Sequence, residues 1–251
     1  MASGNGAHLG GPKLWEAGEV LGTIQVLEPL LATWEANSHP SQQRMRAYLA
    51  EIEAAFSSLR LPPGRLFLHM DIDVKDPRRL VRHHDVENYL TPIIYHLGHQ
   101  RFVYVSGSKR VGGGSWMTVG CAVPRAESLN TPAWGHFACH AGRGAQEKRW
   151  KVGLRDALMA AGRTLLPPGP VEAHLVWRCS PSRNWVWLWK PTGDAMGPVL
   201  GSSHPRNPFS PDDDRIVKLG LHLNSEPAMG HDVDVAMWWR LLPPEDDSLS
   251  V

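Results

Sequence analysis

The 251-residue sequence is poor in cysteine and lacks long apolar runs. Its three cysteines, Cys121, Cys139 and Cys179, are an odd and unclustered set, which favours a reducing, cytoplasmic setting over a disulfide framework. No stretch of about 18 consecutive apolar residues occurs, so the sequence offers no membrane-spanning helix and predicts no membrane partner. The first residues lack the charged-then-apolar order of a signal peptide, and we expect residues 1–19 to form a flexible leader.

The sequence also lacks a strong charge bias. Its formal net charge is +1, which gives the protein no general attraction to nucleic acid. The segment 75–84 departs from this balance, because four lysines or arginines and two histidines stand there against one aspartate. Such a run is either a solvated loop or a place for phosphate contact. Apolar residues make up 42% of the chain, enough to pack one large domain or two ordinary ones.

One corner of the sequence occurs twice. Leu-Pro-Pro-Gly stands at 61–64 and again at 166–169, and a histidine follows each copy at the same distance, as His69 and His174. Self-similarity of this kind indicates a duplicated unit. The alternative is a single domain in which two Pro-Pro-Gly turns coincide by chance.

The segments around the two corners match in order. Before each corner, apolar residues recur at three- and four-residue steps and predict amphipathic helices, 43–60 and 148–165, which the prolines end. After each corner the pattern predicts a strand, a short helix and two strands: 65–74, 85–98, 101–107 and 115–123, then 171–178, 191–201, 215–224 and 232–241. We therefore expect an α/β (α+β) protein of two tandem helix-plus-mixed-sheet units, with halves at 20–124 and 148–242, a linker at 125–147 and a flexible tail at 243–251.

Each half also carries one acidic motif. Asp85, Glu87 and Asn88 open the short helix of the first half, and Asp212-Asp213-Asp214 stands directly before a strand of the second. In this combination the chain resembles the RusA-type Holliday junction resolvases, in which an Asp-x-Asp-Asn helix start is followed by an Asp-Asp strand start. The order of elements extends the resemblance over roughly residues 20–241. The chain looks like an internally duplicated and diverged member of that family.

The resemblance implies a fold, an activity and a site. The family's small mixed α/β unit works as a dimer, so a tandem chain would form a pseudo-dimer, and two such chains could pair again. The implied activity is Mg²⁺-dependent cleavage of branched DNA. Asp85, Glu87 and Asp213 would be catalytic, and the Mg²⁺ or Mn²⁺ ligands would come from these three with Asp212 and Asp214. We expect the Asp85 and Asp213 carboxylates within roughly 8 Å of each other, because one ion or its water shell must bridge them.

The sequence departs from the family pattern at several positions. Glu87 stands where the family has a second aspartate, and Thr91 where a lysine is usual. The first half has His99-Gln100 in place of the strand-start acids, and the second has Pro191 and Gly193 in place of the helix-start acids. Each half thus keeps one part of a site.

Other readings of the acidic motifs remain open. Carboxylates at a helix N-terminus are favoured by its dipole and free N–H groups without any further function. A run of three aspartates is normally a solvated turn. A rival function is a catalytically inactive pseudo-nuclease that binds branched or modified DNA, and another is an unrelated α/β enzyme.

DNA contact is predicted for basic and polar residues near the first acidic motif. Two of them, Lys109 and Arg110, open a Gly-rich segment that predicts a hairpin turn whose tip could grip a DNA backbone. The predicted set is Lys75, Arg78, Arg79, Arg82, His84, Asn88, Lys109 and Arg110.

Tryptophan is concentrated in the second half. Trp185, Trp187 and Trp189 alternate with Val186 and Leu188, which predicts a strand with all three rings on one face. That face would be buried in the sheet or at the junction between halves. The alternative is stacking on unpaired bases.

Overall fold

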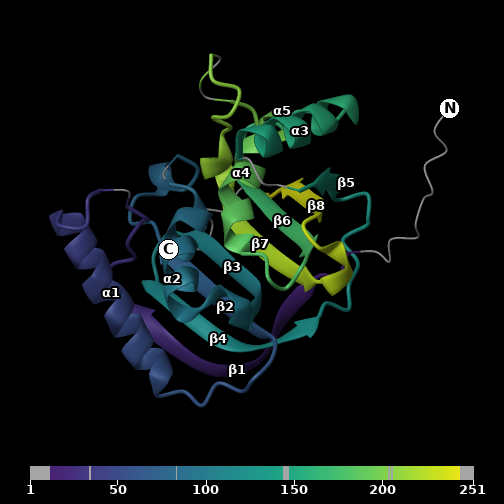
Figure 1. Ribbon diagram of the computed structural model, residues 1–251. Helices are drawn as coiled ribbons and strands as arrows, with labels where there is room; N and C mark the ends of the chain where they lie inside the picture. Colours follow the sequence, from purple (N-terminus) through teal and green to yellow (C-terminus); the bar gives the residue numbers. More distant parts are fainter. Residues whose placement is uncertain are drawn as a thin grey trace.

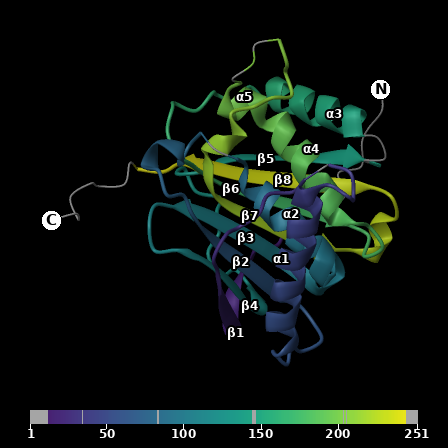
Figure 2. The ribbon, with the colours of Figure 1, turned by 90° about the vertical axis from the view of Figure 1, so that its left-hand side faces the viewer.

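The structure, a computed structural model, describes residues 12–33, 35–82, 84–143, 147–202, 204 and 206–243. In this part of the chain eight strands form a mixed sheet, and the helices pack against it (Figures 1 and 2). None of the described helices is both long and apolar enough to cross a membrane. The protein is therefore of the mixed α+β class that the sequence predicts.

The strands and helices follow the predicted order in both halves. The first half contains β1 (Trp15–Val26), α1 (Pro40–Ser57), β2 (Leu66–Asp73), α2 (Val86–Leu97), β3 (Phe102–Arg110) and β4 (Ser115–Pro124). The second half contains β5 (Gly135–Gly142), α3 (Glu147–Ala160), β6 (Val171–Cys179), α4 (Trp189–Gly193), α5 (Gly197–Leu200), β7 (Ile216–Ser225) and β8 (Val233–Leu241).

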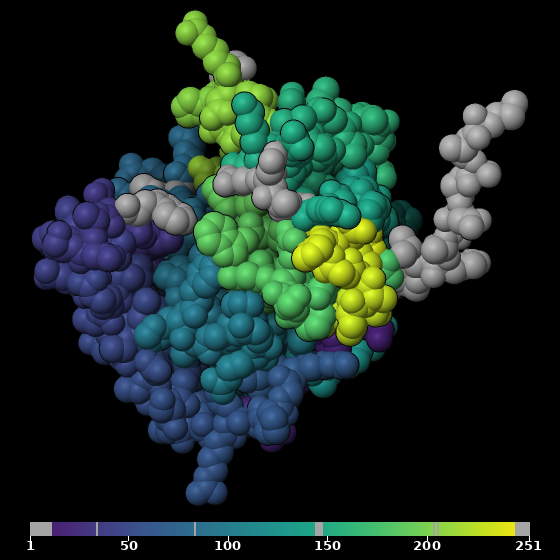
Figure 3. All heavy atoms as spheres, in the orientation of Figure 1, coloured from purple at the N-terminus to yellow at the C-terminus, as the bar shows by residue number. Residues whose placement is uncertain are grey.

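The strand order across the sheet is β1-β4-β2-β3-β7-β6-β8-β5. In the first half β2 pairs in parallel with β3, and antiparallel pairs join β2 to β4 and β4 to β1. The second half has the same pattern, with β6 parallel to β7 and antiparallel pairs joining β6 to β8 and β8 to β5. The halves meet where β3 and β7 pair antiparallel. Figure 3 shows their blue and green-to-yellow surfaces adjoining on one face of the molecule.

The predicted helices before the two corners are confirmed. They bury the apolar stripes that the sequence marks, through Met45, Tyr48, Ile52 and Phe56 of α1 and through Trp150, Leu154 and Leu158 of α3. At the corners themselves, Gly64 and Gly169 have φ of 140° and 141°. Such a backbone strongly disfavours any residue with a Cβ atom, which explains why glycine closes both corners.

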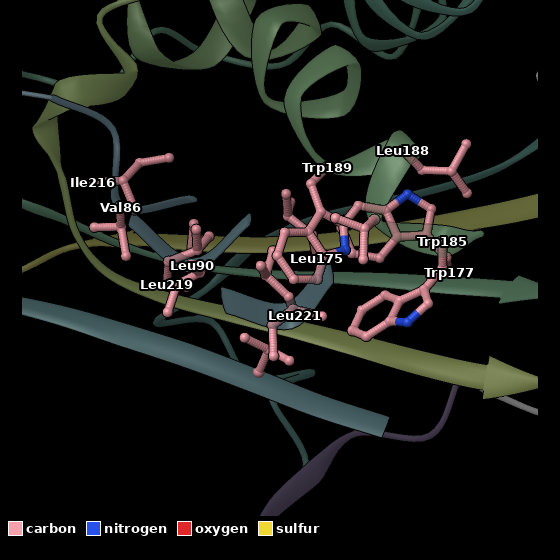
Figure 4. Packing of buried hydrophobic residues seen from close by; sticks show 14 of the residues in the cluster. Val86, Leu90, Leu175, Trp177, Trp185, Leu188, Trp189, Ile216, Leu219 and Leu221 are labelled. Atoms are coloured by element: carbon pink, nitrogen blue, oxygen red, sulfur yellow. The ribbon is translucent and has the colours of Figure 1, made fainter. Parts of the chain in front are cut away.

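One hydrophobic core runs beneath the helices and across the junction of the halves. In Figure 4, Val86 and Leu90 of α2 lie beside Leu219 of β7, and the rings of Trp177 and Trp185 lie close to each other. Leu90 and Trp185 are fully buried. Burying one large apolar side chain stabilises a fold by roughly 1.5–3 kcal/mol, so packing across the junction fixes α2 relative to β7.

A proline inside α2 leaves a carbonyl of this helix free to bind the segment between β1 and α1. Pro92 has no N–H, so it cannot donate to the carbonyl of Asn88 one turn earlier. That carbonyl instead accepts a hydrogen bond of 2.9 Å from the N–H of Ala32. The helix thus continues through the proline with its freed acceptor satisfied.

The Trp-rich segment is helical, so the prediction of a strand there is wrong. Residues Trp185–Leu188 form a 3₁₀ helix that continues into α4, and the Asn184 side chain caps it by accepting from the N–H of Val186. Trp185 and Trp189 are one helical turn apart and are both buried, whereas Trp187 points away with 68% of its surface exposed. Alternation in so short a run fits a helix with two buried positions as well as a strand.

Two predicted boundaries are also wrong. β1 begins inside the expected leader because Trp15 is buried, and its indole N–H donates to the carbonyl of Leu223 at 2.9 Å. β5 lies inside the expected linker, where it pairs with β8 and buries Phe137. Without β5, the hydrogen-bonding groups along β8 would form an open sheet edge.

Candidate metal centre

The first acidic motif stands at the N-terminus of α2. Asp85 is the N-cap residue, but its side chain makes no capping hydrogen bond to the helix. Its carboxylate accepts instead from the Asn88 side-chain amide at 3.0 Å. Glu87, in the first turn, is only 8% exposed, and its Oε1 has no hydrogen-bond partner among the described residues. Capping therefore does not account for the side chain of Asp85.

The second acidic motif is held beside the first by the β3–β7 pairing. Asp213 begins a 3₁₀ turn, Asp213–Arg215, that leads directly into β7, and α2 packs against both β3 and β7. Arg215 fixes this turn by donating to the carbonyls of Gly169 at 3.0 Å and Leu200 at 2.6 Å. Asp213 is buried as a result, with 8% of its surface exposed.

The predicted convergence of the two motifs is confirmed. One carboxylate oxygen from each of Asp85, Glu87 and Asp213 lies within 4.8 Å of the other two. This is well inside the roughly 8 Å expected for groups that share an ion or its water shell. Residues contributed by both halves of the chain thus form one acidic cluster, which we call the acidic triad.

Lys190 lies against the acidic triad, and sequence reasoning missed it. Its Nζ is 2.7 Å from Asp85, 3.0 Å from Asp213 and 3.5 Å from Glu87. The lysine begins the second turn of the Trp-rich helical segment, in α4. One signal could have found it: Lys190 follows Asp85 by 105 positions, the spacing that also separates the two Leu-Pro-Pro-Gly corners.

A fourth carboxylate extends the cluster on the side of α4. Asp194 is 5% exposed and lies 3.1 Å from Lys190 and 2.5 Å from Lys151. Asp194 therefore shares its charge between two lysines, whereas the three carboxylates of the acidic triad converge on Lys190.

The acidic triad carries more negative charge than Lys190 compensates. Three carboxylates face one ammonium, so two negative charges are in excess when all are ionised. Burial raises the pKa of Glu87 well above its usual range, and the Asp85 charge adds to this effect against Lys190. Burial also raises the pKa of Asp213 to about 7, with Lys190 opposing and Asp85 adding to the shift. A second cation would relieve this repulsion.

The pKa of Lys190 responds in the opposite sense to the same charges. Burial alone would lower it, but the carboxylates of Glu87, Asp213 and Asp85 outweigh burial and raise it above the ordinary lysine value. The ammonium is therefore charged at neutral pH. Its side chain remains 44% exposed, which leaves room for the amine to withdraw toward solvent.

The donor set fits a hard divalent cation. Carboxylate oxygens are the ligands that Mg²⁺ and Mn²⁺ prefer. Opposite ligands of one ion are separated by twice the bond length, roughly 4.2 Å for Mg²⁺. The oxygens of the acidic triad, all within 4.8 Å of one another, are thus spaced on the scale of the ligands of one ion or of its water shell. Oε1 of Glu87 accepts no hydrogen bond among the described residues and lies 3.5 Å from the Lys190 ammonium, so an ion could use it as a ligand.

Asp212 and Asp214 do not join the acidic triad, although both were predicted as ligands. Asp213 is buried in the turn Asp213–Arg215, whereas Asp212 and Asp214 are half-buried. Burial raises the pKa of the Asp214 carboxyl, with Lys109 opposing the shift. Of the three adjacent aspartates, Asp213 is thus the one that meets the first motif.

Most of the predicted DNA-contact residues surround the entrance to α2. Lys75, Arg78, Arg79 and Arg82 are exposed in the segment between β2 and α2. Arg78 is held by Asp76, to which its Nε and Nη2 both donate at 3.0 Å. His84 is exposed and has φ of 53°, an uncommon conformation for a residue other than glycine.

The placement of Lys109 at a hairpin tip is wrong. Lys109 lies within β3 and is 4% exposed, and its Nζ donates to the carbonyls of Asp214 at 2.5 Å and His84 at 3.3 Å. Burial lowers the pKa of this amine to about 8, against the raising effect of Asp214 and Asp85. Lys109 joins the segments that carry the two acidic motifs. Arg110, at the end of the strand, lies 3.6 Å from Asp71.

No protein-family model, curated protein or solved structure matches this chain. The geometry of the site and the resemblance of its motifs are therefore the basis for assigning a function.

Proposed function

We propose that this protein is a Mg²⁺-dependent, structure-selective DNA endonuclease, similar to the Holliday junction resolvases of the RusA type. The observation that carries the proposal is the convergence of Asp85, Glu87 and Asp213 within 4.8 Å. Burying three carboxylates together is costly, and a bound cation offsets that cost. Their positions before α2 and before β7 are those of the two family motifs.

The residues of the site divide into ligands and charge-stabilising groups. Asp85, Glu87 and Asp213 would hold the ion, which supplies a polarised phosphate and a water of lowered pKa. Asn88 orients Asp85 through its amide, and Lys109 holds the two motif-bearing segments together. Lys190, at 2.7 Å from Asp85, can turn its ammonium toward a phosphate oxygen and stabilise negative charge there.

An internally duplicated, pseudo-dimeric chain is part of the proposal. The matching strand order of the two halves supports it, as does the near-identical backbone of Gly64 and Gly169. His69 and His174 add a further match of position, since each stands three residues into its strand, β2 or β6.

The register of the central strand pair supports the same symmetry. Phe102 and Ile216 pair with the first residues of β2 and β6, and a one-residue shift follows each pair. Counted from there, Ser106 and Gly220 are equivalent, and they are partners in the β3–β7 pair. A pairing in which equivalent residues face each other is what a two-fold axis produces. One acidic site per chain would then nick one strand, and two associated chains would provide two sites.

A pseudo-nuclease that binds branched or modified DNA is the second candidate. Lys190 favours it, because an ammonium among the three carboxylates supplies a cation without any metal. The basic residues before α2 would then serve binding alone. The two candidates differ in whether a divalent ion is needed for any activity.

Cleavage of a labelled four-way DNA junction in Mg²⁺ tests the proposal. The wild-type protein should cut the junction, and Asp213→Asn should abolish cutting because one ligand charge is lost. Binding should survive this substitution or tighten, since a repulsive carboxylate beside the phosphate is gone. Asp212→Asn is the matched control and should cut normally. A wild-type protein that binds junctions but cuts none in Mg²⁺ or Mn²⁺ would establish the pseudo-nuclease instead.

A further inference from the structure

A cavity of about 810 Å³ opens beside the acidic triad. Its wall includes Asn88, which binds Asp85, and Lys190, which contacts all three carboxylates. The cavity and the acidic triad therefore share two residues. Anything that fills the cavity lies next to the place where an ion would bind.

Two exposed aromatic rings stand at this cavity. Trp187, from the Trp-rich helical segment, is 68% exposed, and Tyr95, from α2, is 39% exposed. Their centroids are 6.3 Å apart in an edge-to-face arrangement. In the same segment Trp185 and Trp189 are fully packed. Trp187 is thus free of the core that holds the rest of its segment.

The cavity wall carries the cations Arg183 and Lys190, of which Lys190 is already paired with the carboxylates of the acidic triad. Arg183, Lys190 and His231 line it, and no carboxylate does so among the described residues. Arg183 lies within 3.5 Å of the His231 carbonyl, so its guanidinium is held at the wall. The wall also has side chains that can form hydrogen bonds with a ligand: those of Asn88, Thr91, Ser182 and Asn184. The cavity combines an aromatic surface, fixed cations and hydrogen-bonding groups.

We propose that this cavity receives one unpaired nucleotide of the DNA strand that enters the acidic site. The base would stack on the face of Trp187 and meet the ring of Tyr95 edge to face, and its phosphate would face Arg183 and Lys190. The inference rests on the proposed function and names the substrate feature that its site selects. A cavity of this size lies within the range that encloses small ligands. Stacking on an aromatic ring accepts any base, and the guanidinium of Arg183 complements a phosphate.

This occupant predicts a preference among DNA structures. A base within a duplex is stacked and paired, so it cannot enter the cavity without an unstacking cost of a few kcal/mol. For an unpaired nucleotide at a branch, the free energy of unstacking is much smaller. Branched DNA with one unpaired nucleotide at the branch should therefore bind more tightly than a fully paired junction of the same sequence.

The fluorescence of 2-aminopurine tests the inference without any cleavage. The probe is placed as the single unpaired nucleotide at the branch of a labelled DNA junction, and binding is measured in EDTA. Wild-type protein should quench the probe, because 2-aminopurine loses emission when it stacks on an aromatic ring. Trp187→Phe should keep the quenching, and Trp187→Leu should lose it and bind this junction about tenfold more weakly. Both variants should bind the fully paired junction as the wild type does.

Each outcome is informative because Trp187 is exposed and its replacement leaves the core unchanged. Equal quenching by the wild type and Trp187→Leu, or no quenching by the wild type, would overturn the inference. Cleavage of junctions without quenching would support the proposed endonuclease activity and contradict nucleotide binding in the cavity. Quenching that depends on Trp187, in a protein that does not cut DNA, would support nucleotide binding in the cavity and contradict the proposed endonuclease activity. The same junctions made with a ribonucleotide at the probe position distinguish DNA from RNA as the preferred strand.

Discussion

The ammonium of Lys190 lies 2.7 Å from the carboxylate of Asp85, a residue 105 positions earlier in the chain. The contact joins the two halves of the protein at the point where α2 and α4 begin. It also makes Lys190 the cation that the acidic triad holds when no metal is bound. The lysine and a divalent ion should therefore neutralise the same carboxylates. The free energy of unfolding should then depend on both.

Replacing Lys190 tests this relationship. In EDTA at pH 8, Lys190→Met should lower the free energy of unfolding, because three buried carboxylates lose their counter-charge. Breaking a fully buried ion pair costs about 3–5 kcal/mol. The half-exposed position of Lys190 reduces the expected loss to roughly 1–3 kcal/mol. Urea unfolding measures the change, and Mn²⁺ should restore more stability to the variant than to the wild type. Lys218→Met, at an exposed lysine of β7, should change little.

Asp213 gives the stability a defined pH dependence. Its pKa rises from 3.8 in the unfolded chain to about 7 in the folded one, chiefly through burial. The protonated Asp213 carboxyl therefore favours the folded state. This contribution to the free energy of unfolding is complete below pH 3.8, the pKa in the unfolded chain, and is lost as the pH rises through about 7, the pKa in the folded chain. Asp213→Asn, which stays neutral, should gain stability over the wild type between about pH 4 and pH 7 and keep that gain above it. Urea midpoints at pH 4.5 and pH 8 in EDTA measure this, and an equal or smaller gain at pH 8 would contradict it.

The basic segment before α2 should bind the DNA backbone. Arg78→Glu combined with Arg79→Glu should weaken binding to branched DNA and reduce the steepness of its salt dependence by about two counterions. Fluorescence anisotropy across a range of salt concentrations measures both effects. Arg44→Glu combined with Arg46→Glu makes the same charge change on exposed positions of α1. Equal weakening by both pairs would indicate a loss of net charge rather than a contact at Arg78 and Arg79.

The two corners should respond alike to substitution. Gly64→Ala and Gly169→Ala each force a side chain onto a backbone with φ near 140°, at a cost of roughly 1–2 kcal/mol. At Gly169 the added Cβ also comes within 3.2 Å of Leu241, which increases the cost slightly. Gly153→Ala is the control, since it lies in α3 with open space around it and should gain about 0.5–1 kcal/mol. Thermal unfolding measures all three, and corners that tolerate alanine would contradict the account of their geometry.

The parts of the fold that rest on local patterning could be predicted from the sequence. The stripe of Met45, Ile52 and Phe56 specifies a helix by its spacing, and the order of motifs placed Asp85 near Asp213. The helix depends on periodicity alone, whereas the nearness of Asp85 and Asp213 was expected from the resemblance of their motifs to those of a known family. They are visible before any tertiary contact is known.

Other features depend on tertiary contacts that no local pattern records. Lys190 meets Asp85 only because β3 and β7 pair, and Lys109 is buried only because the segments before α2 and β7 cross above it. The Trp-rich segment is too short to separate a strand from a helix by its alternation. β5 is a strand because β8 offers it hydrogen bonds, although its own sequence has few apolar residues.

Binding of Mn²⁺ tests most directly whether the two halves build one cation site. Titration of the wild-type protein, followed by electron paramagnetic resonance of the free ion, should show one tight site per chain. Asp85→Asn and Asp213→Asn should each abolish it, because the ligands come from both halves, while Asp212→Asn should retain it. A wild-type protein that binds no Mn²⁺, or a site that survives the loss of either Asp85 or Asp213, would contradict the composite centre.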